Sequence, residues 1–219
     1  MKGLFAIGMR CLPAAVWMLA VAACGMFGAV ESAAAAETPA ETAQNLRSAV
    51  FAGGCFWCVE EAFDKVPGVV ETTSGYTGGT VANPTYEQVT AGGTAHAEAL
   101  LVRYDAKKVS YETLLDVFWR NIDPFDRGGQ FCDRGNSYRS TIFYHTDEQK
   151  RLAEESKKAV EARLGKTVVT PIERAGPFYP AEMYHQNYHE NNPARYRFYK
   201  WNCGRAQRLE AIWGKPKEN

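Results

Sequence analysis

Two cysteines in the segment Cys55-Phe-Trp-Cys58 are the residues best suited to carry chemistry. A short apolar run at residues 49–52 leads through two glycines into this segment, and a helical pattern follows it. This order predicts a strand, a tight turn and a helix. Cys55 then lies at the helix start, where free N–H groups and the positive end of the helix dipole favour a thiolate. With Phe56 and Trp57 beside it, we predict a nucleophilic sulfur next to a surface that holds a small apolar group.

The same pair of cysteines also fits a structural disulfide, a buried thiol or part of a zinc site. Six cysteines in 219 residues are too few for a disulfide-dense scaffold. Four thiolates could bind zinc, but the bulky Phe-Trp insert and the lack of a second Cys-x-x-Cys pair in the sequence argue against it, and no other metal is expected. Two cysteines lie in the N-terminal segment and four in the body: Cys11 and Cys24, then Cys55, Cys58, Cys132 and Cys203.

The composition is that of a globular protein with balanced charge. Hydrophobic residues make up 46% of the chain and charged residues 23%, enough to bury a domain of ordinary size. Twenty-five basic residues balance 25 acidic ones, so there is no electrostatic attraction to nucleic acid or to an anionic membrane. We therefore expect small molecules or protein surfaces as partners. Nothing in the sequence indicates an organic cofactor.

The first 36 residues are typical of a secretory signal peptide. Basic residues precede an apolar run, and small residues before Glu37 supply an Ala-x-Ala cleavage site. The alternatives are a lipoprotein signal that leaves Cys24 acylated, or an uncleaved anchor; only these would bring the chain to a membrane. Each of these three interpretations predicts that the rest of the chain lies outside the cytoplasm, in the periplasm if the source is a bacterium. We expect a linker at residues 37–45 and a single catalytic domain at residues 46–219.

Strand and helix signals alternate along the body, which implies a two-layer α/β arrangement. Ser110 and Thr146 are placed to cap the two longest helices. Beyond Pro177 the chain is rich in aromatic residues and has no clear period until residue 206, so we predict an irregular tail. Besides the strand and helix around Cys55, the predicted elements are strands at 69–75, 96–104, 137–145 and 167–173, and helices from 85 and at 110–121, 146–164 and 206–213.

Glu98 is the most informative carboxylate in the sequence. It lies in a predicted strand of Ala, Leu and Val, where burial would raise its pKa and keep it protonated, as a hydrogen-bond donor, near neutral pH. From the pattern alone, an exposed position at a strand edge is favoured. His185 and His189 have the i, i+4 spacing of a metal pair but lack the glutamate that zinc hydrolases place after the first histidine. Packing or hydrogen bonding is the better interpretation.

Taken together, these segments resemble the A-type peptide methionine sulfoxide reductases over residues 50–191. The resemblance rests on six motifs that occur in the family's order. They are Gly54-Cys-Phe-Trp57, Gly75-Tyr-Thr-Gly-Gly79, Asn83-Pro-Thr-Tyr86, His96-Ala-Glu98, Asp133 with Tyr138-Arg-Ser140, and His185-Gln186. With the strand and helix pattern, we expect an α/β (α+β) two-layer sandwich with a ferredoxin-like plait, followed by the irregular tail.

The resemblance implies that the protein reduces methionine S-sulfoxide, free or in polypeptides, without a cofactor, and so repairs oxidised exported proteins. Cys55 would attack the substrate sulfur and remain as a sulfenic acid. The resemblance implies that Phe56 and Trp57 form an apolar pocket for the substrate methyl group. Hydrogen bonds to the sulfoxide oxygen would come from Tyr86, Tyr138 and a protonated Glu98. Asp133 would support the polar end of this pocket.

A second thiol is needed to regenerate the enzyme. In the family the resolving cysteine commonly lies in the C-terminal tail, which favours Cys203; Cys58 competes because it is one helical turn from Cys55. A thioredoxin-like dithiol would reduce the resulting disulfide. Cys132 has no assigned role. Two rival functions are a thioredoxin-like exchanger that uses the Cys55–Cys58 pair and a non-catalytic zinc-binding module.

Overall fold

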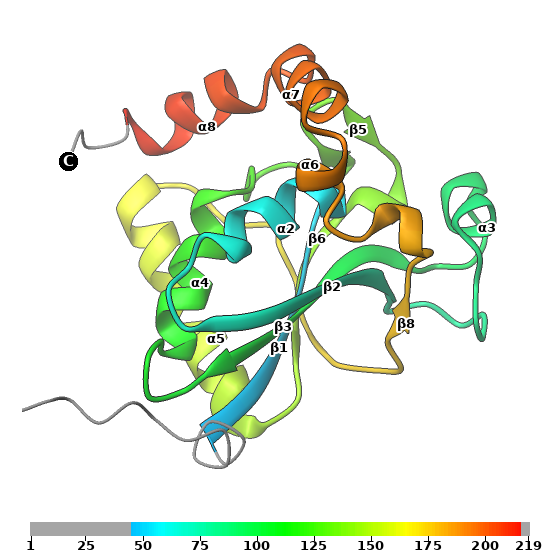
Figure 1. Cartoon of the computed structure of the whole chain (residues 1–219). Helices are drawn as coiled ribbons and strands as arrows, with labels where there is room; N and C mark the ends of the chain where they lie inside the picture. Colours follow the sequence, from blue (N-terminus) through cyan, green and yellow to red (C-terminus); the bar gives the residue numbers. More distant parts are fainter. Residues whose placement is uncertain (1–44, 216–219) are drawn as a thin grey trace, which may run out of the picture. The chain divides into compact units, whose positions relative to one another are not determined.

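The computed structural model describes residues 45–215 (Figure 1). The predicted signal peptide, with Cys24, and the predicted linker up to residue 44 lie outside this range. Within residues 45–215, no helix combines the length and the apolar character needed to cross a membrane.

Four long strands form the centre of the sheet, in the order β6-β1-β3-β2 with every neighbouring pair antiparallel. Helix α2 connects β1 to β2, and helix α4 lies between β3 and β6. This β-α-β-β-α-β order is the ferredoxin-like plait, as predicted. The elements are β1 (Leu46–Gly53), α2 (Phe56–Asp64), β2 (Val69–Thr77), β3 (Ala97–Asp105), α4 (Tyr111–Arg120) and β6 (Ser140–Tyr144).

Two short strands widen the sheet at its edges. Strand β7 (Ile172–Arg174) runs parallel to β6, and β8 (Tyr179–Pro180) runs antiparallel to β2. Only part of the predicted strand at 167–173 pairs in this way. The close approach of β8 explains Gly75, because a Cβ there would lie 2.4 Å from the Tyr179 carbonyl oxygen.

The helices cover one face of the sheet and enclose the main core. Helices α2, α4 and α5 (Asp147–Leu164) pack there, and alternate residues of β1 point toward them. Phe51 is fully buried, with ring centroids 5.1 Å from Phe63 and 5.2 Å from Phe118. As predicted, the Ser110 hydroxyl caps α4 by accepting the Thr113 N–H at 3.2 Å, and Thr146 caps α5.

The opposite face of the sheet carries a smaller core, over which none of the helices within residues 45–215 packs. Val50 and Ala52 of β1 lie on this face beside Phe143 of β6, and partly buried Ala175 and Phe178 pack against them. The layer arrangement is therefore helices on one face and an extended segment on the other, in agreement with the predicted two-layer sandwich.

The tail is more helical than predicted. It contains η2 (Met183–His185), α6 (Tyr188–Asn191), α7 (Pro193–Asn202) and α8 (Arg205–Trp213), of which only α8 was expected. Helix α7 shows no apolar period because its aromatic residues face in two directions: Tyr196 is buried, whereas Phe198 and Trp201 are exposed. The prediction of an irregular tail is therefore wrong for residues 193–202.

Between these elements lie the short segments that supply several site residues. Helix α3 (Tyr86–Ala91) begins at a Thr85–Gln88 capping box. A two-stranded ribbon and a 3-10 turn follow α4: β4 (Gly129–Gln130), β5 (Asp133–Arg134) and η1 (Asn136–Tyr138).

Candidate active site

One small cavity, of about 80 Å³, gathers most of the predicted site residues. They come from α2, α3, β3, β5 and η1, so four of the six sequence motifs meet at this cavity, whereas no residue of Gly75–Gly79 or of His185-Gln186 lines it. An eighth lining residue, Tyr199 of α7, was not predicted. The lining consists of Cys55, Phe56, Trp57, Tyr86, Glu98, Asp133, Tyr138 and Tyr199.

The glycine turn after β1 sets the position of Cys55. Gly54 has φ +85°, and a Cβ on it would lie 2.6 Å from the Gln130 Cβ, so this position needs glycine. Cys55 is the N-cap residue of α2, and its carbonyl accepts the Cys58 N–H at 3.1 Å. The sequence prediction of a sulfur at a helix start is confirmed.

The charge distribution within the thiol pair differs from the prediction. Burial, together with the Cys58 side chain, raises the pKa of the Cys55 thiol well above its ordinary value. The hydrogen bond from Cys55 lowers the pKa of Cys58 to about 6, and Arg205, Tyr196 and Lys200 act in the same direction. Of the two thiols, Cys58 is therefore the one whose ionised form the surroundings favour.

Aromatic side chains build the apolar wall of the cavity around the first turn of α2. The Trp57 ring stacks on Tyr188 of α6, with centroids 3.7 Å apart and planes 7° from parallel. Its Nε1–H donates to His185 Nδ1 at 3.1 Å. His185 also lies 5.0 Å from the Phe56 ring, centroid to centroid. These contacts fix both rings that the sequence placed beside Cys55.

The two predicted histidines have separate roles. His185 is a hydrogen-bond acceptor for Trp57, whereas His189 lies near carboxylates of α2, with Nε2 3.5 Å from Asp64 Oδ2. Gln186, between them, holds the tail to β2 by accepting the Ser74 N–H and donating to the Ser74 carbonyl, each at 2.9 Å. The interpretation as packing and hydrogen-bonding residues is confirmed.

Glu98 points into the cavity from β3 and is only 1% exposed. The exposed position favoured by its strand pattern is therefore wrong. Burial raises the pKa of Glu98 to about 8, although the Phe56 N–H donates to its Oε2 at 3.0 Å. Burial also raises the pKa of Tyr86 to about 12. At neutral pH the cavity thus presents an un-ionised carboxyl and phenolic hydroxyls.

Activity that depends on a neutral Glu98 should fall as pH rises through about 8, where the carboxyl loses its proton. Below that pH Glu98 keeps its proton, so Glu98 causes no loss of activity at acidic pH. We expect kcat/KM against pH to show an alkaline limb near this value. Glu98→Gln keeps a neutral donor and should show a lower plateau without that limb. An unchanged limb in Glu98→Gln would assign it to another group.

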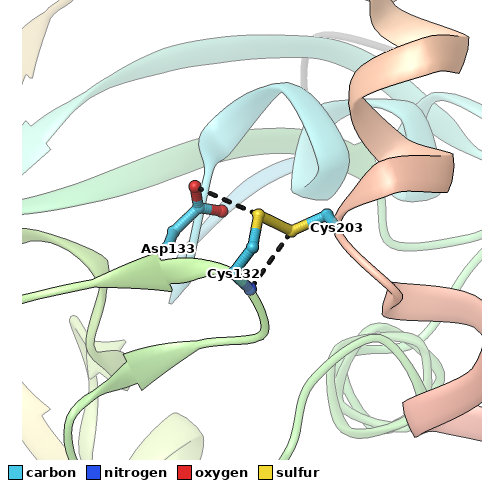
Figure 2. Close-up of side chains that lie close together, drawn as sticks. All are labelled: Cys132, Asp133 and Cys203. Atoms are coloured by element: carbon cyan, nitrogen blue, oxygen red, sulfur yellow. Dashed lines mark hydrogen bonds between the residues drawn. A yellow bond between two sulfur atoms is a disulfide. The ribbon is translucent and has the colours of Figure 1, made fainter.

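Asp133 and Tyr199 close the polar end of the cavity. The Tyr199 hydroxyl donates to Asp133 Oδ2 at 2.5 Å, and burial raises the pKa of Asp133. Next to Asp133, Cys132 forms a disulfide with Cys203, at the end of α7, with Cα atoms 4.9 Å apart (Figure 2). The Cys132 Sγ lies 3.7 Å from Asp133 Oδ1.

This disulfide bears on two interpretations of the cysteines. Cys203, favoured as the resolving thiol, is bonded to Cys132, while Cys55 and Cys58 are both free and buried. The arrangement also argues against a four-thiolate zinc site, because two of the sulfurs are bonded to each other. Cys132, Asp133 and Cys203 do lie close together, but a disulfide offers no thiolate ligand.

Two thiols that lie side by side can give up two electrons by forming a disulfide. The neutral donors of Glu98 and Tyr86 face the same cavity, where a departing oxygen would need stabilisation. Together with the small volume, this chemistry is that of a thiol-dependent oxidoreductase acting on a compact oxidised group.

Comparison with known proteins identifies the family. A family model described as peptide methionine sulfoxide reductase matches residues 47–217. The peptide methionine sulfoxide reductase MsrA of Bacillus licheniformis is 51% identical over 178 residues, which cover 80% of this chain and 98% of that protein. The MsrA of Listeria monocytogenes is 48% identical over 174 residues, covering 78% and 98%. The chain belongs to the peptide methionine sulfoxide reductase family.

The fold agrees with solved structures of related enzymes. Mxr1 from Saccharomyces cerevisiae, in reduced form, matches with a TM-score of 0.65 at 32% identity, over 72% of this chain and 90% of that one. Methionine sulfoxide reductase A of Corynebacterium diphtheriae matches with a TM-score of 0.62 at 30% identity, over 68% and 76%. As a member of this family, the protein is an oxidoreductase that reduces methionine sulfoxide.

Proposed function

We propose that the protein reduces the S epimer of methionine sulfoxide, free or within a polypeptide, and that Cys55 takes the oxygen. The observation that supports this most strongly is the cavity itself, in which Cys55 faces the neutral side chain of Glu98 across a space of about 80 Å³. A terminal S-methyl group and one oxygen are small enough to enter such a space, whereas the rest of a peptide would stay outside.

Each end of the sulfoxide has a matching wall. The methyl group lies against Phe56 and Trp57, which are held in place by the tail. The oxygen accepts hydrogen bonds from Glu98, Tyr86 and Tyr138, and these strengthen as negative charge develops on it. Epimer selectivity follows from this geometry, because exchanging the methyl group and the oxygen would place a polar atom against the rings.

The reaction starts when the Cys55 sulfur donates an electron pair to the sulfoxide sulfur. As Cys55 attacks, Cys58 takes up its proton, because the surroundings favour ionised Cys58 over ionised Cys55. The oxygen then passes from the substrate sulfur to the Cys55 sulfur. The substrate S–O bond and the bond between the two sulfurs break, methionine leaves with the electron pair on its sulfur, and the new S–O bond leaves Cys55 as a sulfenic acid. Cys55 is thereby oxidised by two electrons and the substrate sulfur is reduced by two.

Regeneration then uses Cys58 in preference to the tail cysteine. The Cys58 thiol attacks the Cys55 sulfenic acid, water leaves, and a Cys55–Cys58 disulfide forms. Support comes from the positions of the two thiols, which are both free and buried and lie one helical turn apart at the start of α2. Cys203, in contrast, is already bonded to Cys132. A thioredoxin-like dithiol then reduces the Cys55–Cys58 disulfide by exchange.

The place of action proposed for the enzyme is outside the cytoplasm, where it would repair oxidised exported proteins. The support is the sequence of residues 1–36, with its basic start, apolar run and Ala-x-Ala site. Expression of the full chain in a bacterium, followed by fractionation and N-terminal sequencing, tests this. Recovery of a periplasmic chain beginning at Glu37 supports it; an acylated Cys24 would indicate a lipoprotein, and an intact cytoplasmic chain would contradict export.

The activity is tested by supplying each sulfoxide epimer separately with thioredoxin and its reductase. We expect steady methionine formation from the S epimer and almost none from the R epimer. A thioredoxin-like exchanger would instead reduce model disulfides while leaving both epimers untouched. That outcome would contradict the proposal.

A further inference from the structure

The Cys132–Cys203 disulfide lies next to the Tyr199–Asp133 hydrogen bond in the cavity wall. Cys132 directly precedes Asp133, and Cys203 lies one helical turn beyond Tyr199, whose carbonyl accepts the Cys203 N–H at 2.9 Å. The Tyr199 hydroxyl in turn donates to Asp133 Oδ2 at 2.5 Å. The covalent link therefore joins the two segments close to this hydrogen bond; Figure 2 shows the Asp133 side chain beside the disulfide.

Tyr199 contacts the reacting end of the cavity as well as Asp133. It lines the cavity together with Cys55, and its ring meets Trp57 edge-on, with centroids 5.8 Å apart and planes at 83°. Its hydroxyl can also donate to an ionised Cys55 sulfur, and this acts to lower the pKa of that thiol against the effect of burial. A phenol has one proton to donate, so Tyr199 can donate to Asp133 while Cys55 is protonated and to the Cys55 sulfur once that thiol ionises.

Contacts besides the disulfide keep α7 and α8 on the domain. The Tyr196 hydroxyl donates to Glu61 at 2.6 Å, and Arg208 of α8 pairs with Asp123 at 2.7 Å. Loss of the disulfide would therefore leave the tail docked but let the end of α7 shift. A shift of this kind acts on Tyr199 first, because it is the α7 residue that lines the cavity.

We infer that the Cys132–Cys203 disulfide is a permanent link that holds Tyr199 against Cys55 and takes no part in turnover. The inference rests on the proposed function. Tyr199 is then an additional catalytic residue, and Cys132 and Cys203 are positioning residues that act through it. A strong dithiol that reduces this exposed link to two thiols, and is itself oxidised, should slow the enzyme although Cys55 and Cys58 are fully reduced.

Tyr199→Phe tests the hydroxyl without disturbing the disulfide. We expect kcat/KM for methionine S-sulfoxide to fall by about tenfold, the usual effect of losing one hydrogen bond to an ionised group. The pH at which Cys55 becomes reactive toward iodoacetamide, measured in a Cys58→Ser background, should rise. Tyr144→Phe is the matched control, because Tyr144 lies at the end of β6 with Lys150 over its ring. Unchanged kinetics and an unchanged alkylation profile in Tyr199→Phe would overturn the inference.

The double variant Cys132→Ser, Cys203→Ser tests the link. It should still release methionine stoichiometrically, with a kcat/KM lowered in the same direction as in Tyr199→Phe. Adding Tyr199→Phe to this variant should cost much less than it does in the parent, because both changes remove the same contact. Fully additive losses, or an inability to form a disulfide at the active site, would overturn the inference. Methionine release by the parent, measured alongside, reports on the proposed function separately.

Discussion

Cys55→Ser should abolish methionine formation, lowering kcat/KM by about 10⁴-fold or more. A hydroxyl of the same shape fills the N-cap position of α2, so the fold and the cavity should persist. What is lost is the polarisable sulfur that donates an electron pair and then carries the oxygen. Neither Glu98 nor the tyrosines can replace it, since they only stabilise charge on that oxygen.

The measurement is methionine release from the S-sulfoxide with excess dithiol, beside a thermal unfolding curve that shows the variant is folded. Cys132→Ser with Cys203→Ser is the control, because it removes two sulfurs but leaves the nucleophile. Retention of even a tenth of the parent rate by Cys55→Ser would rule out Cys55 as the oxygen acceptor.

Cys58→Ser should give one turnover and then stop when thioredoxin is the reductant. The sulfenic acid still forms on Cys55, but no adjacent thiol condenses with it. We expect about one methionine per protein in the first phase and a steady-state rate lower by about a hundredfold, because a thioredoxin has no disulfide to reduce. A small thiol in excess should restore part of the rate by reacting with the sulfenic acid directly.

The first phase of this variant should also be slower than that of the parent near neutral pH, and the difference should shrink as pH falls below about 6. In the parent, the pair carries a thiolate above about pH 6, on Cys58, which can accept the Cys55 proton. In Cys58→Ser that acceptor is gone, so Cys55 has to ionise alone from a buried position. Stopped-flow measurement of tryptophan fluorescence is suitable, because Trp57 lies next to Cys55. Sustained turnover of Cys58→Ser with thioredoxin would assign resolution to another cysteine.

The plait could be predicted because its signals are local. A short apolar run marks β1 and apolar alternation marks β3, and Ser110 and Thr146 mark helix starts through hydrogen bonds within one turn. Helix α7 was missed because its aromatic residues divide between the cavity and solvent, which removes the period that sequence analysis uses. The tail is organised by distant contacts, such as Gln186 with Ser74, that no window of sequence contains.

The active site likewise divides into residues with a local sequence signal and residues brought in by distant contacts. The thiol pair and its rings follow from one short segment, and the family motifs added Tyr86, Glu98, Asp133 and Tyr138. The pattern around Glu98 alone favoured exposure, since alternation does not reveal which face of a strand is covered. Neither Tyr199 nor the Cys132–Cys203 link had a local signal, because disulfide pairing among four cysteines is a property of the folded chain.

The most direct test of the mechanism is a single turnover without reductant, followed by mass spectrometry of the intact protein and its peptides. Protein with Cys55 and Cys58 reduced is mixed with methionine S-sulfoxide. The mechanism predicts about one methionine per protein, a mass loss of two hydrogens and a new peptide link between Cys55 and Cys58, with the Cys132–Cys203 link unchanged. Methionine release with a new link at Cys203, or no release at all, would contradict it.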